Sequence, residues 1–414
     1  MLRFVNKLGY AVAGITGVGT VVYVSKSWSQ KPPLSTNLRL DNKKVIITGG
    51  TNGIGSAVAW NLAVKHGADV TIATRDLKAC EEMKQNAIKE YETIRDKGWK
   101  ESFNRPDLKS EREGKSQKNF NLTDPRDLIT CKLCDLKSFK SVRDFADSVE
   151  KVDILVNNAA VLKPKHNAST AVATKVESNK EGVTGSSKNT LQVISKTENG
   201  NEETFQTNYL SHFYLSNLLR EKFSPGGTII NVTCKAQLEG KLKITDINRV
   251  QDTDSDYNKR SNEMYKQSKL CNVLFTKEAA KRWPEITSIA VDPGQTADSK
   301  LGKRMATDAG IVKHFGYYVN PATWFLKSGM FSGETGQCAQ AVISHLFNPI
   351  KTGHLYDRYE EVLDLLTVEK FEVTATGGFD KAFGNKQVSD AYSSKNSSIL
   401  WKYSCILTDL DNKS

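Results

Sequence analysis

The sequence predicts an α/β protein in which one parallel sheet carries helices on both faces. Three observations lead to this fold class. Short apolar runs, KVIIT at 44–48, DVTIATR at 69–75 and VDILVNNAA at 152–160, have the length and composition of buried strands. Segments with helical spacing separate these runs, and a glycine-rich turn follows the first one. Strands that alternate with helices pair in parallel, which gives a doubly wound sheet.

Local signals place the helices and one further strand. Residues Ile54–His66 have helical periodicity, and Gly67 ends the pattern. Residues Ser138–Glu150 are predicted to form a second helix, because four large apolar residues fall on one face. TIINVTCKAQ at Thr228–Gln237 begins as a buried strand and runs into polar residues. These polar residues are candidates for the chemistry of the site.

A length of 414 residues sets only a loose bound on the number of domains. One large domain with appended segments is enough to account for the patterns. We expect this domain over residues 40–365. Two segments, 98–125 and 163–203, are rich in polar residues and are expected to be solvated surface insertions. Residues 366–414 are expected to form a C-terminal extension.

The N-terminal segment 1–30 is predicted to anchor the protein in a membrane. Leu8–Val24 are 17 uncharged residues flanked by Lys and Arg, just enough for a membrane-spanning helix. A secretory signal peptide and a buried core helix are the alternatives. We favour the anchor because the segment stands outside any domain pattern. Gly9, Ala13 and Gly17 lie four residues apart, which would let two such helices pack closely in a homodimer.

The charge and the cysteine content limit which partners and which cell compartment we expect for this protein. An excess of 58 Lys and Arg over 47 Asp and Glu gives a net charge of +11, which suits anionic cofactors or lipid. No basic run is interleaved with aromatic residues, so we expect no nucleic-acid partner. Seven cysteines with irregular spacing favour reduced thiols in a cytosol-facing domain. Cys131 and Cys134 would face opposite ways on a strand, so we expect buried thiols and no metal site.

The turn TGGTNGIG at 48–55 lies between a predicted strand and a predicted helix. Gly49, Gly53 and Gly55 allow a tight turn and let backbone N–H groups approach a pyrophosphate. A plain strand-to-helix turn is the alternative, but this placement favours a dinucleotide site. Where an acidic residue would bind the ribose of NAD, the chain has Arg75, whose guanidinium suits the 2′-phosphate of NADP. A surface arginine without that role is the alternative reading of Arg75.

Tyr265 and Lys269 lie one helical turn apart in EMYKQSKLCNVLF and so share one helix face. Tyrosine is a poor proton shuttle at neutral pH because its unperturbed pKa is about 10. We expect the neighbouring ammonium to favour the phenolate, so that Tyr265 acts as a general acid and base on an alcohol oxygen. The spacing alone also arises on structural helices, but together with the glycine turn it favours catalysis.

Four motifs, in this order, resemble those of the short-chain dehydrogenase/reductase family. They are TGGTNGIG at 48–55, NNAA at 157–160, YKQSK at 265–269 and DPGQT at 292–296. The likeness covers roughly residues 40–360 and is specific because four motifs agree. Within the family, the chain looks most like the retinol-dehydrogenase-like group and similar fungal membrane or lipid-droplet oxidoreductases. The resemblance implies a Rossmann fold and a dehydrogenase or reductase activity with a nicotinamide cofactor.

The resemblance also implies roles for individual residues. Tyr265 would be the general acid and base, and Lys269 would bind the nicotinamide ribose and lower the pKa of the tyrosine. Asn208 in FQTNYLSHF matches an asparagine that holds a proton-relay water, while Asp135 would border the adenine and residues 157–160 would line the dinucleotide. The expected cofactor-binding set is Gly49, Asn52, Gly53, Ile54, Gly55, Arg75, Asp135, Asn157, Ala159, Tyr265, Lys269 and Pro293.

The fourth expected catalytic residue, Cys234, departs from the family pattern. NVTCKAQ aligns with NVSSxA, in which the second serine hydrogen-bonds the substrate oxygen. A thiol is a weaker donor than a hydroxyl, so we expect it to polarise a carbonyl less well. Thr233 has a hydroxyl, but it reaches the site only if the strand has already ended. Packing of Cys234 beside the site, without a catalytic role, is the alternative.

These features predict a membrane-anchored, NADP(H)-dependent oxidoreductase that moves a hydride between the nicotinamide and a lipophilic alcohol or carbonyl. We expect its catalytic domain to face the cytosol from the endoplasmic reticulum membrane or a lipid droplet. The alternative is a cofactor-binding scaffold or sensor of the same fold with degraded activity, which Cys234 and the polar insertions favour. The lid that shapes the substrate pocket is expected after Pro293, and no motif there names the substrate.

Overall fold

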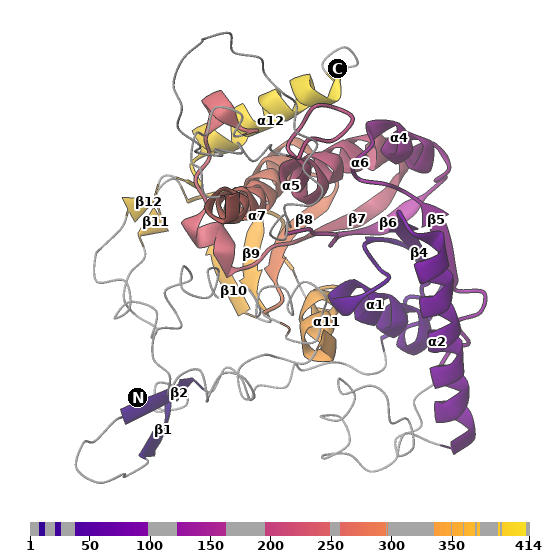
Figure 1. The fold of residues 1–414 in the computed structure, drawn as a ribbon. Helices are drawn as coiled ribbons and strands as arrows, with labels where there is room; N and C mark the ends of the chain where they lie inside the picture. The colour runs from indigo at the N-terminus through magenta and orange to yellow at the C-terminus, as the bar shows by residue number, and fades with distance from the viewer. Residues whose placement is uncertain are drawn as a thin grey trace, which may run out of the picture.

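An eight-stranded sheet forms the centre of the computed structural model (Figure 1). In order across the sheet, the strands are β10 (Glu360–Asp364), β9 (His354–Asp357), β8 (Thr287–Asp292), β7 (Phe223–Val232), β6 (Val152–Asn157), β3 (Lys44–Thr48), β4 (Asp69–Thr74) and β5 (Ile129–Leu133). All neighbours pair in parallel except β9 and β10. This is the strand order of a doubly wound Rossmann sheet, so the predicted fold class is confirmed.

Part of the chain is described by the structure. The described residues are 8–12, 21–25, 38–97, 122–162, 195–248, 257–294, 296, 335–348, 350–358, 360–368, 371–372, 388–389 and 391–410. The predictions for most of the two polar insertions and for the lid after Pro293 fall outside these residues.

Helices cover both faces of the sheet (Figure 1). One layer contains α1 (Gly53–Trp60), α2 (Leu77–Lys97) and α11 (Thr335–Ser344), and the other contains α4 (Phe139–Asp147), α5 (Glu203–Phe205), α6 (Ser211–Leu219), α7 (Tyr257–Arg282) and α12 (Ser394–Thr408). Each face has its own apolar cluster. Ile46 and Ile47 are adjacent in β3 yet belong to opposite clusters, because successive strand residues face opposite ways. Both faces of the sheet are therefore buried, as a parallel sheet requires.

The two helices predicted from local signals are confirmed. α1 continues through a π-helical turn, Asn61–Lys65, and the chain then reverses at Gly67, whose φ is +72°. α4 begins after Ser138, whose Oγ accepts a hydrogen bond from the Ser141 N–H at 3.3 Å. This cap satisfies one of the free N–H groups of the first helical turn.

The N-terminal segment differs from the predicted membrane-spanning helix. β1 (Leu8–Val12) and β2 (Val21–Ser25) pair in an antiparallel sheet, with Leu8 opposite Ser25. Valine and tyrosine are frequent in these strands and favour extended backbone over helix. Over the described residues, no helix combines the length and the apolar character needed to cross a membrane. The predicted anchor helix is therefore not confirmed.

The second polar insertion is shorter than predicted. Residues 195–203 were expected to be solvated, but Asn201 and Glu202 are buried. Asn201 Nδ2 donates to Gln206 Oε1 at 3.1 Å, and Glu202 accepts the Phe205 N–H at 2.7 Å at the start of α5. Capping this helix draws polar residues into the fold, so the last residues of the predicted insertion are buried.

The C-terminal segment contributes a helix to the core. Trp401 of α12 packs edge-on against Phe213 and Trp283, with ring centroids 5.0 and 5.1 Å apart. Lys277 of α7 donates through Nζ to the carbonyl oxygens of Val368 and Tyr392, at 2.6 and 2.8 Å. Between them, β11 (Phe371–Glu372) and β12 (Val388–Ser389) pair antiparallel. Polar and apolar contacts therefore hold Val368, Tyr392 and Trp401 against the helix layer that contains α6 and α7.

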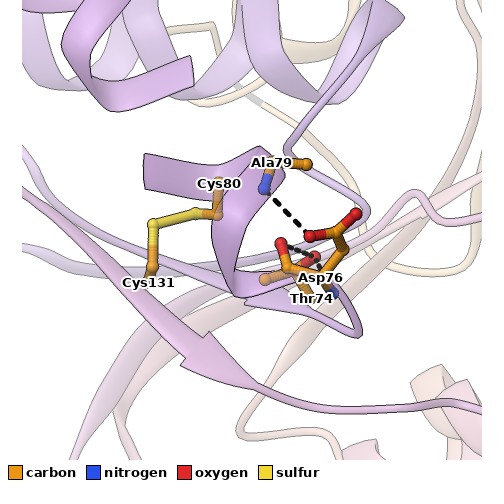
Figure 2. Close-up of a disulfide and its surroundings, with 5 residues drawn as sticks. All are labelled: Thr74, Asp76, Ala79, Cys80 and Cys131. Atoms are coloured by element: carbon orange, nitrogen blue, oxygen red, sulfur yellow. Dashed lines mark hydrogen bonds between the residues drawn. A yellow bond between two sulfur atoms is a disulfide. The ribbon is translucent and has the colours of Figure 1, made fainter. Parts of the chain in front are cut away.

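A disulfide joins Cys80 of α2 to Cys131 of β5 (Figure 2). The expectation of reduced thiols is therefore wrong for Cys131, although Cys134 is a buried free thiol as predicted. The sequence could not show the pair, because 51 residues separate the two cysteines and only the packing of α2 on β5 brings them together. Within the described residues, no group of His, Cys, Asp and Glu is arranged to hold a metal ion.

Candidate active site

The predicted site residues gather at the carboxyl ends of the parallel strands. The sheet order reverses between β3 and β6, because the chain moves outward to β4 and β5 and then returns to the other side of β3. Ligands of doubly wound sheets bind in the crevice at this reversal. The glycine turn follows β3, and residues 157–160 begin at the last residue of β6, so the structure places both at that point.

The glycine turn is shaped by close backbone contacts. Gly49 and Gly53 have φ values of +66° and +58°, which other residues rarely adopt. A Cβ added to Gly49 would lie 2.9 Å from the Cα of Ala159, and one added to Gly55 would lie 2.4 Å from the Gly49 carbonyl oxygen. α1 then starts at Gly53 without a side-chain cap from Asn52. The turn therefore presents a helix N-terminus, which fits the pyrophosphate of a dinucleotide.

Thr48 connects this turn to the rest of the site. Its Oγ1 accepts the N–H groups of Asn158 and Ala159 at 3.0 and 3.1 Å. The same oxygen lies 2.8 Å from Nε2 of His212 in α6. Asn158 Nδ2 donates back to the carbonyl oxygen of Thr48 at 3.0 Å and to that of Gly49 at 3.2 Å. The loops after β3 and β6 are thus held as one unit.

Asn157 lies deeper than its expected role implies. Its side chain is 1% exposed and donates to Asn231 Oδ1 at 2.8 Å and to Ser216 Oγ at 3.2 Å. These bonds join β6 to β7 and to α6, inside the fold. The side chain that lies against the glycine turn is that of Asn158, which the sequence placed in the 157–160 segment without a separate role.

Arg75 lies in the turn after β4 and is exposed to solvent. Figure 2 shows its two neighbours, Thr74 and Asp76. Thr74 Oγ1 accepts the Asp76 N–H at 3.1 Å, and Asp76 Oδ1 accepts the Ala79 N–H at 2.9 Å. One oxygen of the Asp76 carboxylate therefore caps the first turn of α2. Asp135 follows β5 and accepts the Lys137 N–H at 3.0 Å, so it stabilises its own turn at the edge of the site.

Three of the predicted catalytic side chains meet where the end of β7 faces the middle of α7. The Sγ of Cys234 lies 3.6 Å from the hydroxyl oxygen of Tyr265. Lys269 Nζ donates to the Val232 carbonyl oxygen at 3.1 Å and lies 5.7 Å from the centroid of the Tyr265 ring. Leu162 packs with Tyr265 and Cys234 in a small apolar cluster. The structure therefore brings together the thiol, the phenol and the ammonium.

The position of Thr233 decides between the two candidate polarising groups. Its hydroxyl donates to the carbonyl oxygen of Lys269 at 3.0 Å, and its side chain is buried. Cys234 instead contacts Tyr265, as the alternation along a strand predicts. The group beside the phenol is thus the thiol, and Thr233 serves to fix α7 on the end of β7.

Asn208 lies in a π-helical turn, Gln206–Leu210, between α5 and α6. Its side chain accepts the Val161 N–H at 2.7 Å and donates to the Val161 carbonyl oxygen and to Ser268 Oγ, at 3.0 and 3.1 Å. Such turns are frequent at functional sites because they displace one residue from the helical ladder. Asn208 therefore fixes the segment after Ala160 to the helix that carries Tyr265 and Lys269.

Burial is the largest cause of the pKa shifts of Tyr265 and Lys269. It raises the pKa of Tyr265 well above its ordinary value, and the neighbouring Cys234 and Asp292 raise it further. Burial also lowers the pKa of the Lys269 ammonium, against the opposing effects of Cys234 and Asp292. The expected lowering of the tyrosine pKa by Lys269 is therefore not found. A phenol without solvent keeps its proton, because charging it in a low-dielectric site is costly.

Sequence analysis missed two titratable residues of the site. Burial lowers the pKa of His212 to about 4, so its imidazole is neutral near pH 7 and accepts the Thr48 hydroxyl proton. Its Nδ1 then donates to the Asn208 carbonyl oxygen at 3.0 Å. Asp292, at the end of β8, is 6% exposed, and burial raises its pKa to about 6. Each lies close in sequence to a predicted residue, His212 to Asn208 and Asp292 to Pro293.

Comparisons with known proteins identify the family. No family model matches the chain. Retinol dehydrogenase 13 of Mus musculus is 31% identical over 337 residues, which cover 79% of this chain and 78% of that protein. Retinol dehydrogenase 12 of Mus musculus is 30% identical over 268 residues, and the match covers 63% of this chain and 63% of that protein. An uncharacterized protein from Mycobacterium paratuberculosis shares the fold, with a TM-score of 0.53 at 19% identity over 90% of this chain and 95% of that one. The chain belongs to the short-chain dehydrogenase/reductase family of oxidoreductases.

His212 generates a prediction about stability and pH. The pKa of its imidazole is depressed from 6.5 to about 4 in the folded chain, so on acidification the unfolded chain binds a proton first. The contribution of the neutral imidazole to the free energy of unfolding is complete above about pH 6.5. About 2 kcal/mol of this free energy should be lost between about pH 7 and pH 5. Urea unfolding of the parent and of His212→Gln over this range measures the effect, and the variant should lose that much less on acidification. Parallel curves for the two proteins would contradict it.

Proposed function

We propose that this protein is an NADP(H)-dependent oxidoreductase that moves a hydride between the nicotinamide and a lipophilic alcohol or carbonyl. The observation that carries the proposal is the cluster of Cys234, Tyr265 and Lys269 at the edge of the sheet where the glycine turn lies. A proton donor and a dinucleotide cradle at one edge are what carbonyl reduction requires. The glycine turn fits the cofactor, because backbone approaches there leave no room for side chains.

The residues of the chain would perform the proton transfer. Tyr265, kept protonated by burial, would donate its O–H to the carbonyl oxygen and give up the proton as the alcohol forms. Cys234 would give a second, weaker hydrogen bond to the same oxygen. Bound in this site, the reduced nicotinamide supplies the hydride to the carbonyl carbon. Asn208 and Lys269 would connect the phenol to the source of its next proton.

Arg75 supports the choice of NADP over NAD. The guanidinium is exposed at the end of β4, and the adjacent carboxylate of Asp76 is engaged in capping α2. The 2′-phosphate of NADP would therefore meet a cation at the position where a ribose-binding carboxylate is absent. The remaining cofactor-binding residues of the expected set would surround the pyrophosphate and the nicotinamide.

The lipophilic substrate and the membrane location rest on the relatives and the N-terminal segment. Two relatives are named retinol dehydrogenases, and a retinoid is an apolar alcohol. Residues Leu8–Val24 carry no charge, so the N-terminal segment can associate with lipid whether as a helix or as the paired strands β1 and β2. We place the catalytic domain on the cytosolic side of the endoplasmic reticulum membrane or on a lipid droplet, with a homodimer as one arrangement of the anchor.

Cys234 supports a second candidate function. Burial raises the pKa of its thiol, so the group beside Tyr265 is a neutral, weak donor. A protein of this fold with degraded activity, serving as a cofactor-binding scaffold or sensor, would retain such a site. The two candidates differ in turnover and share nucleotide binding.

Substitutions at Tyr265 and Cys234 test the proposed chemistry. Tyr265→Phe removes the proton donor and should lower turnover by about 10²–10⁴-fold. Cys234→Ser should keep or raise turnover, because a hydroxyl is the stronger donor, and Cys234→Ala should lower it. The measurement is NADPH-dependent turnover across a panel of retinoids, lipid aldehydes and ketones, with Tyr91→Phe on α2 as the control. Full activity of Tyr265→Phe would overturn the mechanism, and activity only in Cys234→Ser would favour the scaffold.

Arg75→Ala tests the choice of nucleotide. Loss of a charged hydrogen bond to the 2′-phosphate should weaken NADPH binding by about 1.5–3 kcal/mol and leave NADH binding almost unchanged. Titration of each nucleotide by calorimetry gives both affinities. Lys78→Ala, an exposed cation in α2, is the matched control and should affect neither nucleotide. Equal losses for NADPH and NADH would show that Arg75 does not bind the phosphate.

Deletion of residues 1–30 tests the anchor. The truncated protein should leave the membrane fraction and still bind NADPH, because the described site residues all follow Leu38. Flotation of full-length and truncated protein with liposomes gives the comparison. Aggregation or loss of nucleotide binding in the truncated protein would place the segment in the core.

A further inference from the structure

Asp292 is a buried carboxylate that the proposed chemistry leaves unused. It ends β8, is 6% exposed, and stands directly before the Pro293–Gly294 segment. One carboxylate oxygen accepts the Gly294 N–H at 2.9 Å, and its own carbonyl oxygen accepts the Arg358 N–H at 2.7 Å. The side chain is thus held by the turn that follows it, and the backbone by the end of β9. A buried charge costs free energy, so a functional reason for it is worth seeking.

The carboxylate acts on the reacting end of the site. Val291, the residue before Asp292, pairs in register with Val232 of β7 and accepts the Thr233 N–H on its carbonyl oxygen at 2.8 Å, so Asp292 lies beside the segment that carries Cys234. Its charge also influences the pKa values of Cys234, Tyr265 and Lys269. The glycine turn lies at the same edge of the sheet, across β6 and β7 from β8. A dinucleotide with its pyrophosphate at the glycine turn would extend its nicotinamide toward Tyr265 and hence toward Asp292.

The oxidised and reduced cofactors differ in charge at the nicotinamide. The ring is positive when oxidised and neutral when reduced, while the phosphates are the same in both forms. A carboxylate close to the ring in a low-dielectric site therefore stabilises one form and not the other. The same attraction grows as a hydride leaves the reduced ring, so it also lowers the barrier to carbonyl reduction.

We propose that the Asp292 carboxylate makes the site prefer the oxidised, positively charged nicotinamide over the reduced, neutral one, and thereby assists hydride transfer to a carbonyl. The inference rests on the proposed function, because it requires that the nicotinamide lies beside Tyr265. It goes further by assigning Asp292 a role in distinguishing the two redox forms. Asp292 would thus determine which redox form of the cofactor binds more tightly.

The surroundings of Asp292 make this preference depend on pH. Asp357 of β9 is its register partner, and the like charge raises the pKa of Asp292, which burial already raises to about 6. Asp357 itself is half-exposed and pairs with Lys235 at 3.5 Å. The charged and titratable groups around Asp292 are Cys234, Lys235, Tyr265, Lys269, Asp357 and Arg358. As the pH falls through about 6, Asp292 gains a proton and the preference should disappear.

Nucleotide affinities test the inference without any substrate. Calorimetric titration gives the dissociation constants of NADP+ and NADPH for the full-length parent and for Asp292→Asn, which keeps the size and an acceptor for the Gly294 N–H. At about pH 8 the variant should bind NADP+ about tenfold more weakly and NADPH almost as the parent does. Between about pH 8 and pH 5 the affinity ratio should fall in the parent and stay constant in the variant. Titration of the 2′-phosphate cancels in this ratio, because both nucleotides carry it.

Asp357→Asn is the matched control. It removes the neighbouring carboxylate but leaves Asp292, so the preference for NADP+ at about pH 8 should persist while its loss moves to lower pH. An Asp292→Asn variant whose affinities for NADP+ and NADPH change by the same factor, or not at all, would overturn the inference and leave the proposed function standing. Failure of the parent to bind either nucleotide would overturn both.

Discussion

The hydroxyl of Thr48 is the contact on which the candidate site depends. Thr48 is the last residue of β3, at the point where the strand order reverses. Its hydroxyl forms hydrogen bonds with the loop after β6 and with His212 of α6. Nδ1 of His212 donates to the Asn208 carbonyl oxygen, so Nε2 accepts the Thr48 proton at 2.8 Å, while the Val156 carbonyl oxygen is a longer acceptor at 3.4 Å. The imidazole must then be neutral, and burial, which lowers its pKa to about 4, keeps it so. The geometry of the glycine turn therefore depends on a neutral His212 in α6. Asn208 contributes to this arrangement because its carbonyl oxygen accepts the Nδ1–H of His212.

The sequence predicted the elements whose signals are local. The strand at 44–48, the helix from Ile54 and the helix after Ser138 follow from apolar periodicity, a glycine stop and a cap, and all three are present. The disulfide between Cys80 and Cys131 was missed because it depends on how α2 packs against β5. The end of the segment 195–203 was misjudged for a related reason, since Asn201 and Glu202 are buried and form hydrogen bonds with Gln206 and Phe205. Composition measures the average environment of a segment, whereas these contacts are made by particular pairs.

The candidate site shows the same division. Helical spacing placed Tyr265 and Lys269 on one face, and strand alternation placed Cys234 toward Tyr265 and Thr233 away from it. The pKa of the tyrosine could not be predicted from neighbours in sequence, because the larger effect is its burial, which depends on the whole fold. His212 and Asp292 carried no motif that would single them out. Their importance comes from contacts with Thr48 and with the ends of β7 and β9, which only the assembled sheet supplies.

The charges at the reacting end of the site form a consistent set for reduction. Tyr265 keeps its proton, so it can donate to a carbonyl oxygen without first being charged. Lys269 is buried, and alone its ammonium would oppose the positive charge that arises on a nicotinamide as a hydride leaves. Asp292, on the strand next to β7, contributes the opposite charge and offsets that repulsion. Burying a carboxylate next to Asp357 costs free energy, and a chain selected for stability alone would gain by a neutral residue at this position. The cost is understandable where the carboxylate acts on a charge that exists only during turnover and in the oxidised cofactor, because it then lowers the energy of the transition state more than that of the reduced complex.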